Sequence, residues 1–209
     1  MKKVLGISPR VIYASRTDRS VHAKENVCSF AASVKMPELA FKRALNAELG
    51  RYVRINRLRK TDDSFNPRYG CLSKIYRYYV SRKEILPYRS DYCLSVPQKL
   101  DRAKMEKAAL LLVGKKNFRH LSSCSNRENT TCDVLNCRIS KGKSDFFIEI
   151  EGSHFLYKMA RTAAAFIISS GTGEIEPAAL GAVLEGRRNR IAPAPACGLY
   201  LWRVKYLAR

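Results

Sequence analysis

The chain has 209 residues, room for one large domain or two small ones. Lys and Arg number 39 against 18 Asp and Glu, a formal net charge of +21, and 46% of the residues are apolar. So large a positive excess destabilises a compact chain unless an anionic partner offsets it, so we expect a nucleic-acid partner whose binding weakens as salt rises. The longest apolar runs are too short for a transmembrane helix. The first ten residues, Met1–Arg10, are basic, and we expect that they do not form a secretory signal.

Cysteine and histidine usage argues against a metal site. The cysteines are odd in number, none stands in a C-x-x-C pair, and the three histidines are scattered. We therefore predict no metal site and reduced thiols. We expect a cytoplasmic protein, with a mitochondrion or another organelle as the alternative.

The first informative stretch is Ala14–Ala23, a polar segment between two apolar runs. Its one carboxylate, Asp18, stands among Arg16, Arg19 and Lys24. Nearby positive charge favours the ionised form of a carboxylate. Asp18 therefore suits a nucleophile or base that acts on an anionic substrate. The alternative is an ordinary turn residue between two strands.

The elements that follow alternate between strand and helix patterns. Up to residue 64 we predict a strand over 27–33, a helix from Pro37 to Gly50, a strand over Tyr52–Leu58 and a turn over Thr61–Ser64. A further strand over Leu72–Val80 places Tyr76, Tyr78 and Val80 on one face and Ile75, Arg77 and Tyr79 on the other. The aromatic face is either a sheet core or a floor for stacked bases.

The second half begins after a crossing segment between Pro87 and Pro97. It begins with a predicted helix capped by Asp101 and ending at Gly114, followed by a basic loop over Lys115–His120 and a polar segment over Ser122–Thr131. We then predict a strand over 146–151 and a helix from Phe155. A short helix from Pro177 to Gly186 and a strand over Gly198–Tyr206 complete the chain.

The helix from Phe155 carries an arginine where burial is expected. Small and apolar residues lie on both of its faces, and Arg161 stands near its middle. An unpaired buried charge costs several kcal/mol. We therefore predict an ion pair between Arg161 and Asp18; the alternative is that Arg161 extends to the surface.

Four blocks in this order resemble the TruA family of tRNA pseudouridine synthases. The family hallmark, G-R-T-D-x-G-V-H-A, stands here as Ser15–Ala23. The other three blocks are F-x-A-R-F-S-A with R-x-Y-R-Y at Phe65–Cys71 and Lys74–Tyr78, F-L-Y-K-M-V-R-N at Phe155–Thr162, and A-P-A-x-G-L-Y-L at Ala194–Leu201. The resemblance runs from about Val11 to Tyr206.

The resemblance implies an α+β fold of two α/β halves, residues 1–86 and 87–209. They share a central mixed, mainly antiparallel sheet with helices outside and an RNA cleft. It also implies a cofactor-free, Asp-dependent isomerisation of uridine to pseudouridine in the anticodon stem-loop of tRNA, by a homodimer. The alternative is a catalytically degenerate relative that serves as an RNA-binding structural or assembly component of a ribonucleoprotein such as a ribosome.

By the same resemblance, the catalytic residues are Asp18, Tyr76 on the target uracil, and Arg161. The substrate-binding and RNA-binding residues are Arg16, Arg19, His22, Arg68, Lys74, Arg77, Lys158 and Leu199.

The chain departs from the family pattern at both hallmark glycines, which are Ser15 and Ser20 here. Serine strains the loop if either position needs a positive φ. Pro67, Thr162 and Cys132 also replace family residues. We further expect the family's opening strand and helix to be missing, which would leave a sheet edge uncovered.

Overall fold

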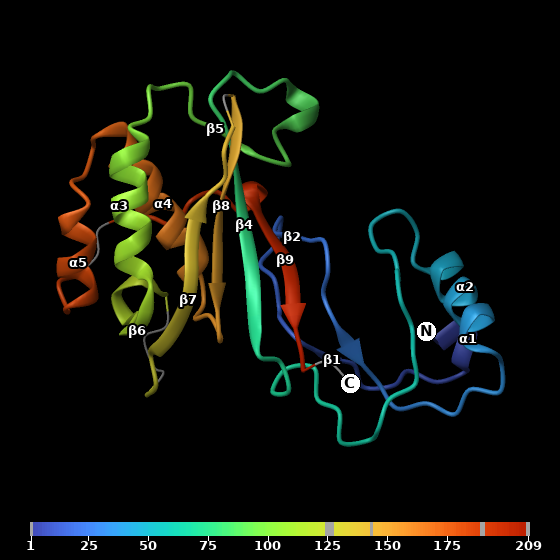
Figure 1. Ribbon diagram of the computed structural model, residues 1–209. Coiled ribbons are helices and arrows are strands. Elements are labelled where there is room, and N and C mark those ends of the chain that lie inside the picture. The colour runs from blue at the N-terminus through green and yellow to red at the C-terminus, as the bar shows by residue number, and fades with distance from the viewer. Residues whose placement is uncertain (1, 124–127, 143, 189–190, 208–209) are drawn as a thin grey trace. The chain divides into compact units, whose positions relative to one another are not determined.

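The computed structural model describes residues 2–123, 128–142, 144–188 and 191–207 (Figure 1). The chain forms two compact units. Unit 1 comprises Met1–Ser15 and Val27–Gly70, and unit 2 comprises Arg16–Asn26 and Cys71–Arg209. The division into halves at residue 86 stays a prediction.

Unit 1 contains two short helices and a two-stranded ladder. Its elements are α1 (Lys2–Leu5), β1 (Ile12–Tyr13), β3 (Cys28–Ser29) and α2 (Glu38–Glu48), with β1 and β3 antiparallel. The helix predicted from Pro37 is confirmed: α2 buries Phe41 and Leu45, one turn apart on the same face.

Two predicted strands of unit 1 fail or shrink. The strand over 27–33 is reduced to the two residues of β3, and Tyr52–Leu58 contains no strand. The Asn46 side chain holds that segment instead, because it accepts from the Ile55 N–H at 2.7 Å and donates to the Ile55 carbonyl at 3.0 Å. Tyr52 and Val53 are exposed, so the alternating pattern does not mark a buried face.

Unit 2 is built on a seven-stranded sheet. Its strands are β2 (His22–Ala23), β4 (Ser73–Ser81), β5 (Leu94–Ser95), β6 (Gly114–Asn117), β7 (Thr131–Ile139), β8 (Asp145–Gly152) and β9 (Leu199–Lys205). They run in the order β2-β9-β4-β8-β7-β6, and β5 pairs with β4. The β2–β9 and β4–β5 pairs are parallel and the others antiparallel. The predicted mixed, mainly antiparallel sheet is therefore confirmed.

Three helices lie together beside this sheet in Figure 1: α3 (Arg102–Leu112), α4 (Met159–Thr172) and α5 (Ala178–Leu184). The Asp101 side chain caps α3 by accepting from the Lys104 N–H at 3.1 Å, as predicted. Short 3-10 turns complete the unit at Pro87–Arg89, Arg119–Leu121 and Ala196–Gly198. No helix among the described residues is long and apolar enough to cross a bilayer.

Two predictions for unit 2 need correction, and one of its strands was not predicted. The basic loop over Lys115–His120 is wrong at its start, because Gly114–Asn117 forms β6, an edge strand whose lysines suit solvent. The alternation of residue types did not predict β7, because a register shift breaks it and leaves Leu135 exposed. Part of the predicted polar segment, residues 124–127, lies outside the description. The helix expected from Phe155 begins only at Met159.

The two faces of β4 have different roles. Tyr76, Tyr78 and Val80 are buried on one face, with 7%, 1% and 1% of their surface exposed. Arg77 and Tyr79 alternate with them and lie on the opposite face. The sheet-core interpretation of the aromatic face is therefore confirmed for Tyr78.

Candidate active site

The site is centred on an ion pair between two segments far apart in the sequence. Arg161 Nη1 donates to Asp18 Oδ2 at 2.9 Å, across a separation of 143 residues. The Asp18 side chain is 26% exposed and that of Arg161 is 16% exposed. The predicted pairing is thus confirmed. The carboxylate is held by a guanidinium on one side and still reaches solvent.

Arg161 is fixed by a second set of contacts. It is the third residue of α4, and its Nε donates to the Ala194 carbonyl at 2.7 Å. The Ala194 N–H in turn donates to the Arg161 carbonyl at 3.2 Å. A planar guanidinium held through both Nε and Nη1 has little freedom to rotate. The direction of the charge that faces Asp18 is therefore set by residue 194.

Strand pairing brings the Asp18 turn close to β9 and β4. His22 lies opposite Tyr200 in the parallel β2–β9 pair, so the turn before β2 lies at the Leu199 end of β9. On the adjacent strand, Tyr76 lies opposite Leu201. Leu199 is buried, and Tyr76 contacts the Phe155 ring edge-on, with 4.8 Å between centroids.

Backbone strain flanks the ion pair on both sides. Ser20 (φ 66°) and Lys158 (φ 62°) are the two non-glycine residues with positive φ in the described ranges. Ser20 follows Asp18 by two residues, and Lys158 precedes Arg161 by three. Positive φ is costly for residues with a Cβ, and such residues cluster at functional sites. Of the two serines that replace family glycines, Ser20 alone takes the left-handed conformation.

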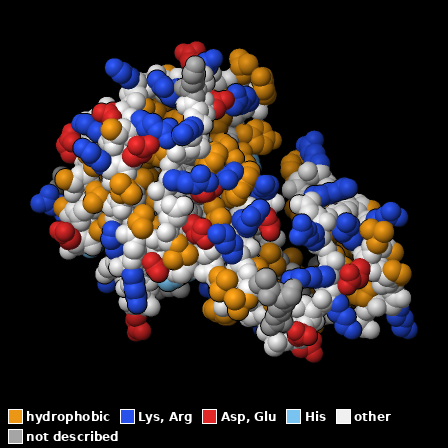
Figure 2. Space-filling view, in the orientation of Figure 1, with side chains coloured by type: hydrophobic (Ala, Val, Ile, Leu, Met, Phe, Trp, Pro, Cys, Tyr) orange, Lys and Arg blue, Asp and Glu red, His pale blue; other side chains and the backbone are white. Residues whose placement is uncertain are grey.

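Several predicted RNA-binding residues lie close to Asp18 or Arg161 in the sequence, or on the same face of the sheet as Tyr76. Arg16 and Arg19 flank Asp18 and are exposed. Lys74 is buried on the same face of β4 as Tyr76. Lys158 Nζ lies 5.0 Å from the centroid of the Tyr157 ring. Figure 2 shows many more Lys and Arg than Asp and Glu side chains on the visible face.

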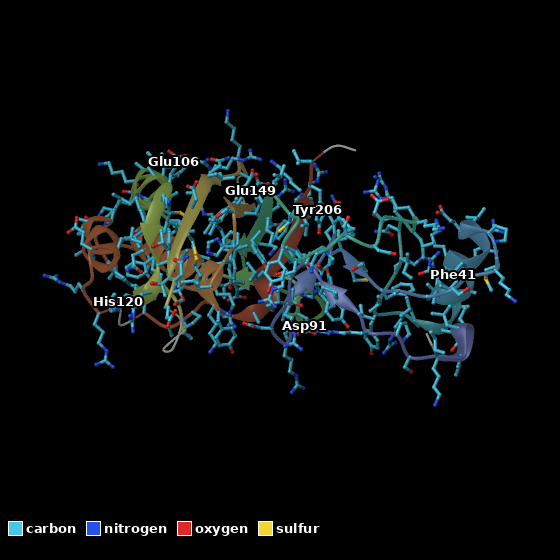
Figure 3. All side chains as sticks on the ribbon, turned by 90° about the horizontal axis from the view of Figure 1, so that it is seen from below. Phe41, Asp91, Glu106, His120, Glu149 and Tyr206 are labelled. Carbon is cyan, nitrogen blue, oxygen red and sulfur yellow. The ribbon has the colours of Figure 1, made fainter. Side chains whose placement is uncertain are left out.

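His22 and Arg77 lie on the opposite face of the sheet from Tyr76. The His22 ring stacks on Tyr200, with 4.6 Å between centroids, and its Nε2 lies 2.7 Å from the Asp91 carbonyl. Arg77 Nε donates to Glu149, labelled in Figure 3, at 2.6 Å.

The Arg77 guanidinium also stacks over the rings of Trp202 and Phe147. His22 Nε2 and Arg77 Nε thus have partners on the face of the sheet opposite Tyr76, and the structure does not bring these two residues into the Asp18 group. Arg68 belongs to unit 1, and its RNA-binding role stays a prediction.

Three contacts were not predicted from the sequence: the Ala194 carbonyl on Arg161, the Phe155 ring on Tyr76, and the Tyr78 hydroxyl, which donates to the Pro195 carbonyl at 2.8 Å. A backbone carbonyl cannot be recognised from residue type. The prolines on both sides of Ala194 were the available signal for a rigid segment.

The described residues contain no group of three His, Cys, Asp or Glu side chains that could hold a metal. Cys132 Sγ lies 3.3 Å from His154 Nε2, and Cys132 is buried. Burial also raises the pKa of Cys137 to about 12, so this thiol stays protonated at neutral pH.

Comparison with known proteins shows the family of this chain. Residues 108–207 match the family model described as tRNA pseudouridine synthase. A tRNA pseudouridine synthase A from an Exiguobacterium species is 32% identical over 200 residues, covering 94% of this chain and 81% of that protein. Proteins of the same name from Staphylococcus saprophyticus and a Thermoanaerobacter species are 35% and 33% identical, covering 93% and 99% of this chain and 74% and 86% of their own lengths. The chain therefore belongs to the TruA family of tRNA pseudouridine synthases.

Proposed function

We propose that this protein isomerises uridine to pseudouridine in the anticodon stem-loop of tRNA, and that Asp18 starts the reaction. The observation that carries the proposal is the Asp18–Arg161 ion pair at 2.9 Å, which is partly open to solvent. The names of the relatives support the enzyme and give no support to a non-catalytic RNA-binding component. The net charge of +21 suits a polyanionic substrate.

The chemistry needs a carboxylate and a closed pocket. The bond between C1′ and N1 of uracil breaks, the base turns, and a bond forms between C1′ and C5. The C5 proton leaves and N1 gains a proton, so substrate and product have the same atoms and the reaction needs no oxidant or group donor. A base inside a helical stack cannot be reached, so the nucleotide must be extruded.

The residues divide this work by position. Asp18 attacks the sugar or the base, or removes a sugar proton, and each route requires an ionised, oriented carboxylate. Arg161 supplies the charge and the hydrogen bond that orient it. Tyr76 and Leu199 are largely buried on one face of the sheet, with 7% and 5% of their surface exposed, and their aromatic and aliphatic side chains suit holding a uracil after its bond to the sugar is broken.

Asp18→Asn tests the assignment. Removal of the charge at nearly constant shape should lower tritium release from C5-labelled uridine in tRNA by more than about 1000-fold, as loss of a catalytic nucleophile does elsewhere. The tRNA dissociation constant should change little, because Asp18 is one anion among many cations. Asp63→Asn, an exposed carboxylate of unit 1, is the matched control and should retain full activity. Activity of Asp18→Asn within tenfold of the unchanged protein would overturn the assignment.

Two further measurements test the finer parts of the proposal. Chemical mapping of pseudouridine in tRNA with and without the gene should show loss confined to the anticodon stem-loop. Failure of the purified protein to modify naked tRNA would favour the non-catalytic alternative.

We also propose that the protein is a cytoplasmic homodimer. Sedimentation would test the oligomeric state, and localisation of a tagged protein would test the compartment.

A further inference from the structure

A second tyrosine of β4 makes contacts that core packing alone does not require. Tyr78 is 1% exposed, and its hydroxyl donates to the Pro195 carbonyl at 2.8 Å. A phenylalanine would fill the same volume without burying a hydroxyl, and a buried hydroxyl costs free energy unless it is hydrogen-bonded. The Tyr78 hydroxyl therefore acts on the segment that carries Pro195.

That segment is the one that fixes Arg161. Ala194, the residue before Pro195, accepts from Arg161 Nε and donates to the Arg161 carbonyl. Pro193 and Pro195 restrict φ on both sides of Ala194, so a displacement of the Pro195 carbonyl is passed on to Ala194. Burial raises the pKa of Tyr78 above its ordinary value, and the charge of Arg161 acts in the opposite direction, as expected if the two groups lie close together.

The Tyr78 ring also contacts the residue before Leu199. A Cβ added to Gly198 would lie 2.7 Å from the Tyr78 Cζ and 2.8 Å from its Cε1. Residue 198 must therefore be glycine for the ring to lie where it does. Leu199 follows directly and lies opposite Tyr78 in the β4–β9 pair. The Tyr78 side chain thus contacts Pro195 and lies against Gly198, both within the segment that runs from Ala194 to Leu199.

We propose that Tyr78 is a positioning residue: its hydroxyl holds the 194–199 segment so that Arg161 presents its guanidinium to Asp18 and Leu199 faces the base. This inference rests on the proposed function. Tyr76 contacts the uracil in that scheme, whereas Tyr78 is enclosed and acts through Arg161.

Tyr78→Phe removes one oxygen and keeps the ring. In single-turnover reactions on tRNA we expect about a tenfold lower rate at saturation, which corresponds to about 1.4 kcal/mol. The enzyme concentration at half-maximal rate should stay within about twofold, since the hydroxyl does not reach RNA. Near-UV circular dichroism verifies that the fold is retained.

Tyr79→Phe is the matched control. Tyr79 is the next residue, lies on the opposite face, and its ring contacts Tyr200 with 4.9 Å between centroids. Its hydroxyl makes no hydrogen bond among the described residues, so this variant should react at the unchanged rate.

A second readout does not depend on activity. The Arg161 Nε–H donates to the Ala194 carbonyl. The rate of hydrogen exchange at this Nε–H, measured by NMR, should be at least about tenfold higher in Tyr78→Phe and unchanged in Tyr79→Phe. An unchanged saturating rate, or unchanged Nε exchange in Tyr78→Phe, would overturn the inference. An inactive unsubstituted protein would instead overturn the proposed function, and the exchange measurement would still decide the role of Tyr78.

Discussion

Ser20→Gly should stabilise this protein, although it replaces a natural residue two positions after the candidate catalytic carboxylate. The Val21 N–H donates to the Asp18 carbonyl at 3.1 Å, which closes a four-residue turn with Ser20 in third place. Ser20 has φ 66°, the conformation for which type II turns select glycine or asparagine at that place. The Ser20 Cβ therefore makes the turn unfavourable.

The size of the effect follows from two opposing terms. The left-handed conformation costs a residue with a Cβ roughly 1–2 kcal/mol. Glycine also lowers the free energy of unfolding by roughly 0.4–1 kcal/mol, because it increases the conformational entropy of the unfolded chain. The net gain is roughly 0.5–1 kcal/mol, equivalent to a rise in melting temperature of roughly 1–4 °C for a chain of this size.

Urea unfolding measures this difference directly. The chain has a single tryptophan, Trp202, which lies in β9 and reports on unit 2, and circular dichroism reports on the whole chain. Ser20→Ala keeps the Cβ and should gain nothing. Ser15→Gly changes the other hallmark serine, which lacks a left-handed backbone, and should lower the free energy of unfolding. Equal stabilisation by Ser20→Ala or by Ser15→Gly would refute the reasoning.

Two other predictions concern Gly198, which directly precedes β9, and Tyr200, which lies in β9. Gly198→Ala should lower the free energy of unfolding by about 1–3 kcal/mol, because the new Cβ overlaps the Tyr78 ring. The control, Gly181→Ala in α5, adds a Cβ that meets nothing within 4 Å and should raise the free energy of unfolding by roughly 0.5–1 kcal/mol. Equal changes for the two variants in a urea titration would contradict this prediction. Burial raises the pKa of Tyr200 from 10.0 to about 12. The unfolded chain thus releases this proton first, so the stabilisation is fully present below pH 10 and is lost as the pH rises towards 12. Tyr200→Phe should reduce the fall in melting temperature between about pH 9 and pH 11, and an unchanged fall would rule out this role.

The sequence by itself determined some of the local elements and one long-range contact. Alternation over β4 and β8 and the Asp101 cap of α3 were sufficient, because periodicity and capping act within a few residues. The Asp18–Arg161 pair was also predictable, since a helix with two apolar faces buries an arginine, and a buried charge requires a partner of opposite sign. Family motifs then indicated what such a pair does.

Only the tertiary structure decided the remainder of the site. Residue type does not reveal which of two serines takes a positive φ, because that depends on how the turn at Asp18 meets β9. Nor does it show that Arg77 is held by Glu149 on the face away from Tyr76, or that Arg161 depends on the carbonyl of Ala194. Strand register and backbone carbonyls are set by packing between distant segments, and a linear pattern of side chains carries little information about either.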